Sequence, residues 1–192
     1  TTNLATHIFN SQMLGPEDPD REIFILIAGW VSSGVRSISS VTVSESPATN
    51  IVSAEEYSAS DGIAGIYRIS LPSGTSGHVV VTFNNTVSWC GIGVVAVTGW
   101  TGSTTPHDTA EDNGGGVNLN DPASGFALAV SAAGDNGAWT GLSEAYDSEV
   151  ETVGEGLGFH SGAFSGALNA ETGRAISFSE GAAIAAAAFA GS

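Results

Sequence analysis

The segment 78–100 constrains the fold of this chain more than any other part of it. It contains two runs rich in β-branched and aromatic residues, 78–83 and 86–100, joined by Asn84-Asn85. Asparagine accepts the left-handed backbone that a tight two-residue turn requires, so the pattern predicts a β-hairpin. In the second run both alternating sets of side chains are apolar, which indicates a strand in the middle of a sheet with layers on both of its faces.

The rest of the chain continues this β-rich pattern. The run 22–31 is again apolar on both alternating sets, and shorter runs follow at a spacing of roughly 8–12 residues with Gly, Ser and Asn between them. The alanine-rich run 182–190 is ambiguous because alanine favours helices, but its flanking glycines leave room only for a short helix, so a closing strand is favoured. We predict an all-β protein with one antiparallel, jelly-roll-like β-sandwich over residues 21–192 and about 12–14 short strands.

The leader, residues 1–20, has two interpretations. Leu4 and Ile8 share one alternating face and His7 and Phe9 the other, so a short strand is expected before the prolines of 16–19. The leader is then either the first strand of the same sheet or an arm that reaches a neighbouring subunit. Both alternatives stay open at this point.

The charge of the chain excludes several kinds of partner. Twenty acidic residues stand against four arginines and no lysine, which gives a formal net charge of -16. Phosphate backbones and anionic lipid surfaces would repel such a protein, so we expect no nucleic-acid and no membrane partner. The longest apolar runs are too short to cross a bilayer as helices, which favours a soluble protein.

No motif for catalysis or cofactor binding is visible in the sequence. A Gly-x-Ser-x-Gly elbow is absent, and none of the four histidines has a local partner that indicates a nucleophile pair. The acids of 144–151 are close in sequence, but a solvated hairpin edge explains them more simply than a glycosidase pair does. We therefore predict no enzymatic activity and no cofactor.

The acidic stretch 108–114 is the one weak candidate for a metal site. Asp108, Glu111 and Asp112 carry the oxygen ligands that calcium prefers, but their spacing does not match a known calcium loop. An ordinary solvated loop is the favoured interpretation. Zinc is improbable because the chain has no cluster of Cys and His.

Six segments in a fixed order carry a family resemblance that spans about residues 21 to 190. The segments are Arg21–Trp30, Arg36–Val43, Gly77–Phe83, Cys90–Val97, Trp139–Glu144 and the closing alanine-rich run. In this order they resemble the small β-rich virion proteins of tailed bacteriophages and prophages, particularly those of marine and other alphaproteobacterial hosts. The resemblance implies a non-enzymatic structural protein of the phage particle.

Within that class, the compact acidic chain favours a capsid decoration or cement protein. Such a protein assembles in the host cytoplasm onto the capsid exterior, as a homo-oligomer and commonly a homotrimer, and bridges subunits of the major capsid protein. We expect the contact surface to combine anchors from the leader with two arginines that pair with carboxylates of the capsid. These residues are Leu4, His7, Phe9, Met13, Arg21 and Arg36.

The alternative is a tail-fibre or receptor-binding module, or more generally a carbohydrate-binding module, that grips a host surface glycan with the loop 101–116. Its expected contact residues are Trp100, His107, Asp112 and Asn113. A stacking platform at Trp100 or Trp139 would be the signature of this function. The chain has no shaft-like repeat or coiled coil, which favours the decoration role.

Overall fold

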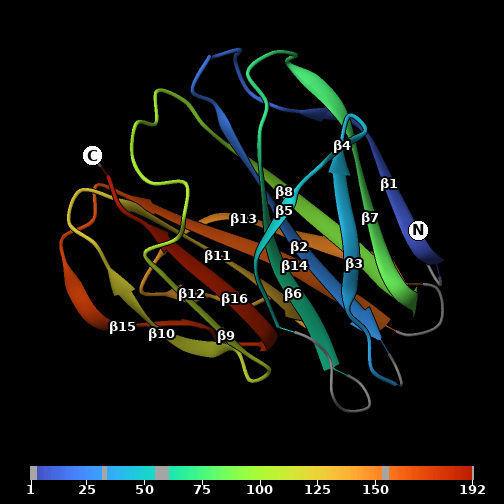
Figure 1. Ribbon diagram of the computed structural model, residues 1–192. Coiled ribbons are helices and arrows are strands. Elements are labelled where there is room, and N and C mark those ends of the chain that lie inside the picture. The colour runs from blue at the N-terminus through green and yellow to red at the C-terminus, as the bar shows by residue number, and fades with distance from the viewer. Residues whose placement is uncertain (1–3, 32–33, 55–60, 153–155, 192) are drawn as a thin grey trace.

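A computed structural model describes residues 4–31, 34–54, 61–152 and 156–191. This part of the chain contains no helix and forms sixteen strands in four antiparallel sheets (Figure 1). The prediction of an all-β, antiparallel β-sandwich protein is confirmed. Its jelly-roll form is not confirmed, because the strands divide among four sheets.

The first half of the chain, up to residue 97, forms two sheets. Sheet A has the strand order β1 (Leu4–Met13), β7 (Ser76–Val87), β3 (Ile38–Val43) and β4 (Ser46–Pro47). Sheet B has the order β5 (Thr49–Ala54), β6 (Asp61–Ser70), β2 (Glu22–Val31) and β8 (Trp89–Val97). The leader therefore contributes the first strand of sheet A, paired with β7.

The second half, from residue 108, forms the other two sheets. Sheet C has the order β13 (Ser143–Thr152), β14 (Gly156–Gly166), β11 (Phe126–Ala133), β16 (Gly181–Phe189) and β9 (Asp108–Asp112). Sheet D has the order β10 (Gly116–Asp121), β15 (Glu171–Phe178) and β12 (Trp139–Thr140). The alanine-rich run 182–190 falls in β16 and is a strand, as favoured from the sequence.

The two halves repeat one topology. In each half the first, third and sixth of seven strands form the outer sheet, as β1-β7-β3 and β10-β15-β12. The other four form the inner sheet in the same order, as β5-β6-β2-β8 and β13-β14-β11-β16, while β4 and β9 are additions. Phe24 and Phe126 lie on the equivalent strands β2 and β11 and pack edge to face, with ring centroids 5.5 Å apart. The chain is thus built from two sandwiches with the same strand order.

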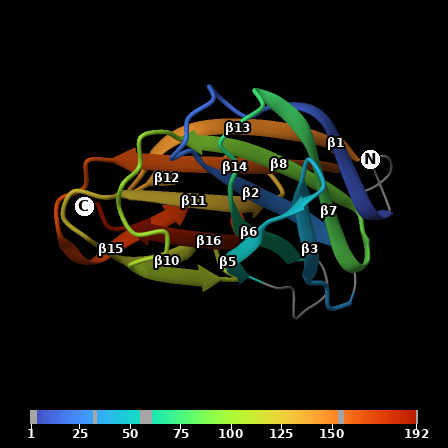
Figure 2. The ribbon, with the colours of Figure 1, turned by 45° about the horizontal axis from the view of Figure 1, so that its top comes forward.

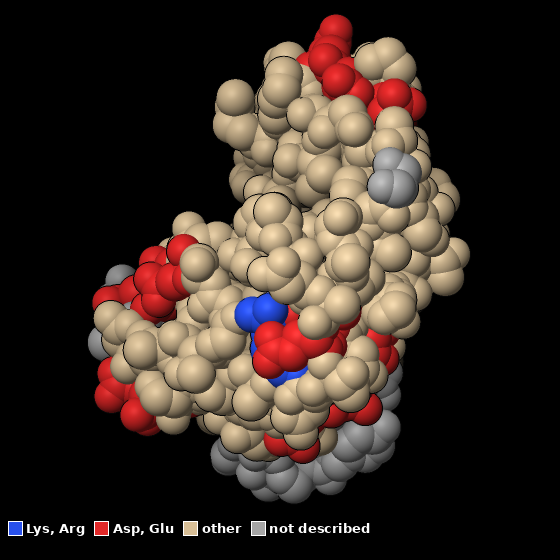
Figure 3. Space-filling view, turned by 90° about the vertical axis from the view of Figure 1, so that its left-hand side faces the viewer, with Lys and Arg blue, Asp and Glu red and all other residues tan. Residues whose placement is uncertain are grey.

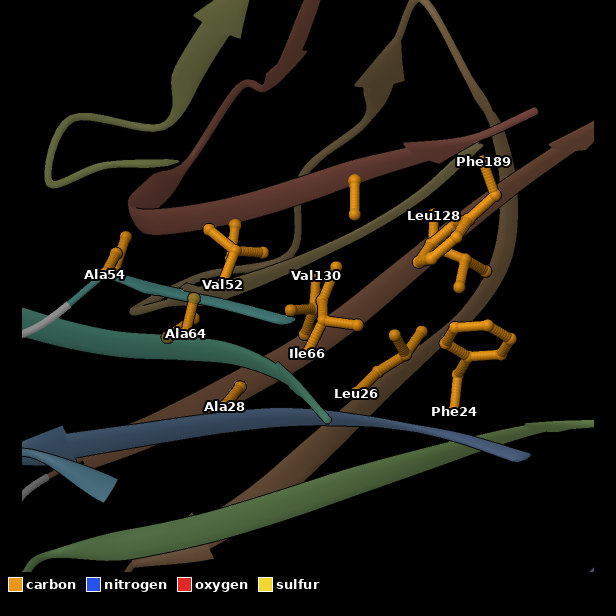
Figure 4. Packing of buried hydrophobic residues seen from close by; sticks show 14 of the residues in the cluster. Phe24, Leu26, Ala28, Val52, Ala54, Ala64, Ile66, Leu128, Val130 and Phe189 are labelled. Carbon is orange, nitrogen blue, oxygen red and sulfur yellow. The ribbon is translucent and has the colours of Figure 1, made fainter. Parts of the chain in front are cut away.

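The sheets stack as four layers in the order A, B, C, D. One hydrophobic cluster joins A to B, a second joins B to C, and a third joins C to D. Figure 2 shows sheets A and D at opposite ends of the stack. In the middle cluster, side chains of the two halves point toward one another (Figure 4). Sheets B and C are therefore covered on both faces, which explains why β2, β11 and β16 are apolar on both alternating sets.

The predicted hairpin over 78–100 is wrong. β7 belongs to sheet A and β8 to sheet B, and the chain changes sheets at Ser88, whose N–H donates to the carbonyl of Trp30 over 2.7 Å. Neither Asn84 nor Asn85 has a positive φ, so both continue β7. β8 has layers on both faces, but it is an edge strand of sheet B and not a central one.

Candidate partner-binding surface

The strand β1 presents apolar side chains to solvent on one face. Leu4, Ile8 and Met13 are 43%, 59% and 73% exposed. Leu4 and Ile8 share the outward parity that the alternation of the sequence indicated, and Met13 follows a register shift between Phe9 and Gln12. Ile8 was missing from the predicted contact residues although the same alternation identified it.

His7 and Phe9 point the other way, toward sheet B. His7 is fully buried, its Nε2 lies 3.0 Å from the carbonyl oxygen of Leu4, and its ring packs edge to face on Phe83 at 5.8 Å. Burial lowers the pKa of His7 below its ordinary value. Phe9 is half-buried against the cluster between sheets A and B. The prediction that His7 is a contact anchor is wrong, because its side chain belongs to the core.

Arg21 is also part of the core and not a partner for a carboxylate outside the chain. Its side chain is 1% exposed, and its guanidinium donates five hydrogen bonds of 2.7 to 3.1 Å to backbone carbonyls. The acceptors are the carbonyls of Gly15, Pro16, Leu71, Ser73 and Gly74. Arg21 thereby joins the turn before β2 to the turn before β7, and the predicted surface role is wrong.

Arg36 remains at the surface beside sheet A. Its guanidinium donates to the carbonyls of Thr86, over 2.7 Å, and Val35, over 2.9 Å, and Val35 itself is 50% exposed. These bonds hold the arginine against the end of β7. Its pairing with a carboxylate of a partner stays a prediction.

The outward face of sheet A carries no ionised acid or arginine. The sequences of β1, β7, β3 and β4 contain no Asp, Glu, Lys or Arg, although 12% of the whole chain is charged. We call this face the sheet A surface. Its outward side chains are Leu4, Thr6, Ile8, Asn10, Met13, Ser40, Thr42, His78, Val80, Thr82 and Asn84.

The sheet A surface ends at an open strand edge. β1 is the outermost strand of its sheet, so within the described residues no strand pairs with its far side. The hydroxyls of Thr6 and Thr82 lie 3.4 Å apart across the pair β1–β7, and Ser11, at φ 54°, marks the bulge near the end of β1. Long uncharged edge strands are sites where another chain can pair or pack.

The acidic stretch 108–114 is mostly a strand and not the loop that the sequence favoured. Asp108, Glu111 and Asp112 lie along β9, which pairs with β16, and Asp108 accepts the N–H of Asn120 over 2.7 Å. Within the described ranges no group of three or more acids, histidines or cysteines is placed to hold a metal ion. The strand spreads the three weak calcium candidates along its length, so the described residues give them no support as a metal site.

The residues of the alternative receptor loop are not brought to one place. The backbone N–H of His107 donates to the carbonyl of Ala188, whereas Asp112 pairs with Ile184, four residues away along β16. That separation is about 14 Å along a strand, and Asn113 follows Asp112. The predicted loop 101–116 also contains β9 and the beginning of β10. The ring of Trp100 packs edge to face on Phe126, with centroids 4.8 Å apart.

Trp100 instead lines a pocket of about 520 Å³ that no sequence pattern indicated. Three separate segments form it: the end of β8 with Trp100, the residues 124–126 at the beginning of β11, and the connection 166–169 after β14. Because these segments are distant in sequence, no local pattern predicts the pocket.

Comparison of the chain with models of protein families, with curated proteins and with solved structures finds no match. In the described residues, no helix has the length and apolar character needed to cross a membrane.

Proposed function

We propose that this chain is a non-enzymatic structural protein of a virus particle that attaches to the outer shell through the sheet A surface, as a decoration protein does. The single observation that carries the proposal is an uncharged sheet face with exposed Leu4, Ile8 and Met13 on a chain of formal net charge -16. The order of β-rich segments in the sequence supports the viral context.

The physical basis is the cost of removing charge from water. The cores of protein interfaces are depleted of charged residues, because an unpaired buried charge is expensive. A contact through the acidic parts of the surface would bury unpaired charges, and those charges would also repel other copies of the chain. A contact through the sheet A surface involves neither charge burial nor charge repulsion, and the Thr, Ser and Asn side chains of this surface can form hydrogen bonds.

The size of the surface suggests that one contact is weak by itself. Strands β1, β7 and β3 contain 10, 12 and 6 residues, so at about 3.4 Å per residue and a spacing of about 4.8 Å they cover about 450 Å². Two such faces together bury about 900 Å², against about 1,600 Å² for a standard interface. Stable attachment therefore relies on many copies on a symmetric lattice or on a homo-oligomer such as a trimer, because linked weak contacts reinforce one another. We propose the major capsid protein as the partner.

The test is binding of point variants to purified shells that lack this protein. Ile8→Glu places a carboxylate in the middle of β1 and is expected to weaken binding at least about 30-fold, equivalent to about 2 kcal/mol. The matched control is Asn118→Glu, which adds the same charge to an exposed position of β10, the strand equivalent to β1 in sheet D. Equal binding by both variants would contradict the proposal.

Deletion of β1 would be a poorer test than these substitutions. Leu14 and His7 are fully buried, and β1 covers part of the cluster between sheets A and B. A truncated chain would lose stability as well as contacts, so reduced binding would not locate the interface.

A further inference from the structure

We infer that the pocket beside Trp100 binds a neutral sugar unit, such as the end of an uncharged glycan. This inference rests on the pocket alone and not on the role proposed for the sheet A surface. A volume of about 520 Å³ lies within the usual range for small-ligand sites.

The aromatic part of the pocket is held in a fixed position. The indole N–H of Trp100 donates to the carbonyl of Ser103 over 3.3 Å, and the ring packs against Phe126 at 4.8 Å. Since its N–H is engaged, the half-buried ring offers the pocket its apolar surface. Val97 and Leu168 extend that surface, which suits the C–H face of a pyranose ring.

The polar side chains of the pocket are available for hydrogen bonds to a ligand. Ser124 and Asn169 line it, and their side chains make no hydrogen bond to any other described residue. A hydroxyl and an amide can each donate to and accept from the hydroxyls of a sugar. Both residues are exposed to solvent, so a purely apolar ligand that displaced water from them would offer no hydrogen bond in return, which favours a ligand with polar edges.

The two walls of the pocket are tied together by the backbone. Ser124 donates to the carbonyl of Leu168 over 3.0 Å, and Leu168 donates to the carbonyl of Gly125 over 3.2 Å. Ser124 and Ala167 have φ of 58° and 52°, a conformation that costs non-glycine residues energy. The pocket therefore exists before a ligand arrives, which lowers the entropic cost of binding.

The charge around the pocket selects against ionic ligands. None of the lining residues is an acid or an arginine, so no group is present to pair with a charged ligand. On the side of the molecule that lies to the left in Figure 1, acidic side chains gather in separate clusters and leave a broad uncharged area between them (Figure 3). The negative chain repels anionic sugars, and the uncharged lining gives cations no partner.

The experiment is a titration of the whole chain with methyl glycosides of glucose, galactose and mannose and with N-acetylglucosamine, followed by tryptophan fluorescence and saturation-transfer NMR. At least one of these sugars is expected to bind with a dissociation constant of roughly 1 mM, as befits one sugar ring in an open site. Trp100→Phe keeps an aromatic ring against Phe126 and should remove the fluorescence change. Asn169→Ala should weaken binding about fivefold, whereas Asn118→Ala, on β10, should not change it.

Glucuronate and benzyl alcohol serve as an anionic and an apolar comparison ligand. The inference is overturned if none of the neutral sugars binds, if either comparison ligand binds better than all of them, or if Asn118→Ala weakens binding as much as Asn169→Ala. Trp100→Phe and Asn169→Ala should leave attachment to shells unchanged, so failure of the sugar titration is distinguishable from failure of the sheet A proposal.

Discussion

Replacing Arg21 tests how this fold is held together at its most unusual buried group. The guanidinium is 1% exposed and donates to five backbone carbonyls, and among the described residues no carboxylate lies within ion-pair distance of it. Hydrogen bonds to a charged donor contribute about 1.5–3 kcal/mol each, so a simple sum would exceed the stability of most domains. Desolvation of the guanidinium offsets several kcal/mol of that sum.

The expected net loss for Arg21→Met is about 3–5 kcal/mol, because the methionine fills the space of the stem but leaves the carbonyls of two turns without donors. For a chain of this length that loss lowers the midpoint of thermal unfolding by about 6–20 °C. Urea and thermal unfolding measure it, with Arg36→Met as the control. Arg36 is only partly buried and donates to two carbonyls, so the loss of stability for Arg36→Met should stay below about 1.5 kcal/mol. A loss below about 1 kcal/mol for Arg21→Met, or equal losses for both variants, would refute the reasoning.

Three further predictions concern buried residues on the two faces of sheet B, the first two between sheets B and C and the third between sheets A and B. A Cβ on Gly93 would collide with the ring of Tyr146, whereas a Cβ on Gly134 would meet nothing within 4 Å. In urea unfolding, Gly93→Ala should therefore lower the stability by about 1–3 kcal/mol, and the control Gly134→Ala by less than about 0.5 kcal/mol. Burial lowers the pKa of His160 to about 4, so between pH 6.5 and pH 4 the unfolded chain binds a proton at this side chain and the folded chain does not. As the pH falls through this window, the stability should decrease by at most about 3 kcal/mol. The decrease should be smaller in His160→Gln, and an unchanged pH profile would show that His160 already titrates normally when folded. Burial also raises the pKa of the Cys90 thiol, so iodoacetamide should alkylate it only in denaturant, and rapid alkylation of the folded chain would contradict its burial.

The sequence predicted which strands are buried on both faces, but it did not predict which strands pair with one another. Apolar residues on both alternating sets of 22–31 correctly indicated that β2 lies centrally, because the pattern reports burial on two faces. The same pattern in 89–97 belongs to an edge strand, since a layer can cover both faces of an edge strand as well. Pairing partners are distant in the chain, so the exchange of β7 and β8 between sheets has no local signature. The repeated strand order was likewise invisible, because it lies in the pairing and not in matching residues.

The candidate surface was predicted in part for the same reason. Alternation placed Leu4 and His7 on opposite faces, but it could not tell which face sheet B covers, and it could not predict the register shift after Phe9 that leaves Met13 exposed. The burial of Arg21 was not predicted because its hydrogen-bond acceptors are backbone carbonyls, and the pattern of side chains in a sequence does not reveal them. The pocket at Trp100 depends on three segments that only the tertiary fold brings together.

The most direct measurement of the central claim is high-resolution imaging of purified particles, with the copy number of this protein determined by quantitative mass spectrometry. We expect many copies on the head, oriented with the sheet A surface and the exposed Ile8 against the shell and with sheet D pointing away from it. A few copies at the tail tip, or head density with sheet D against the shell, would contradict it.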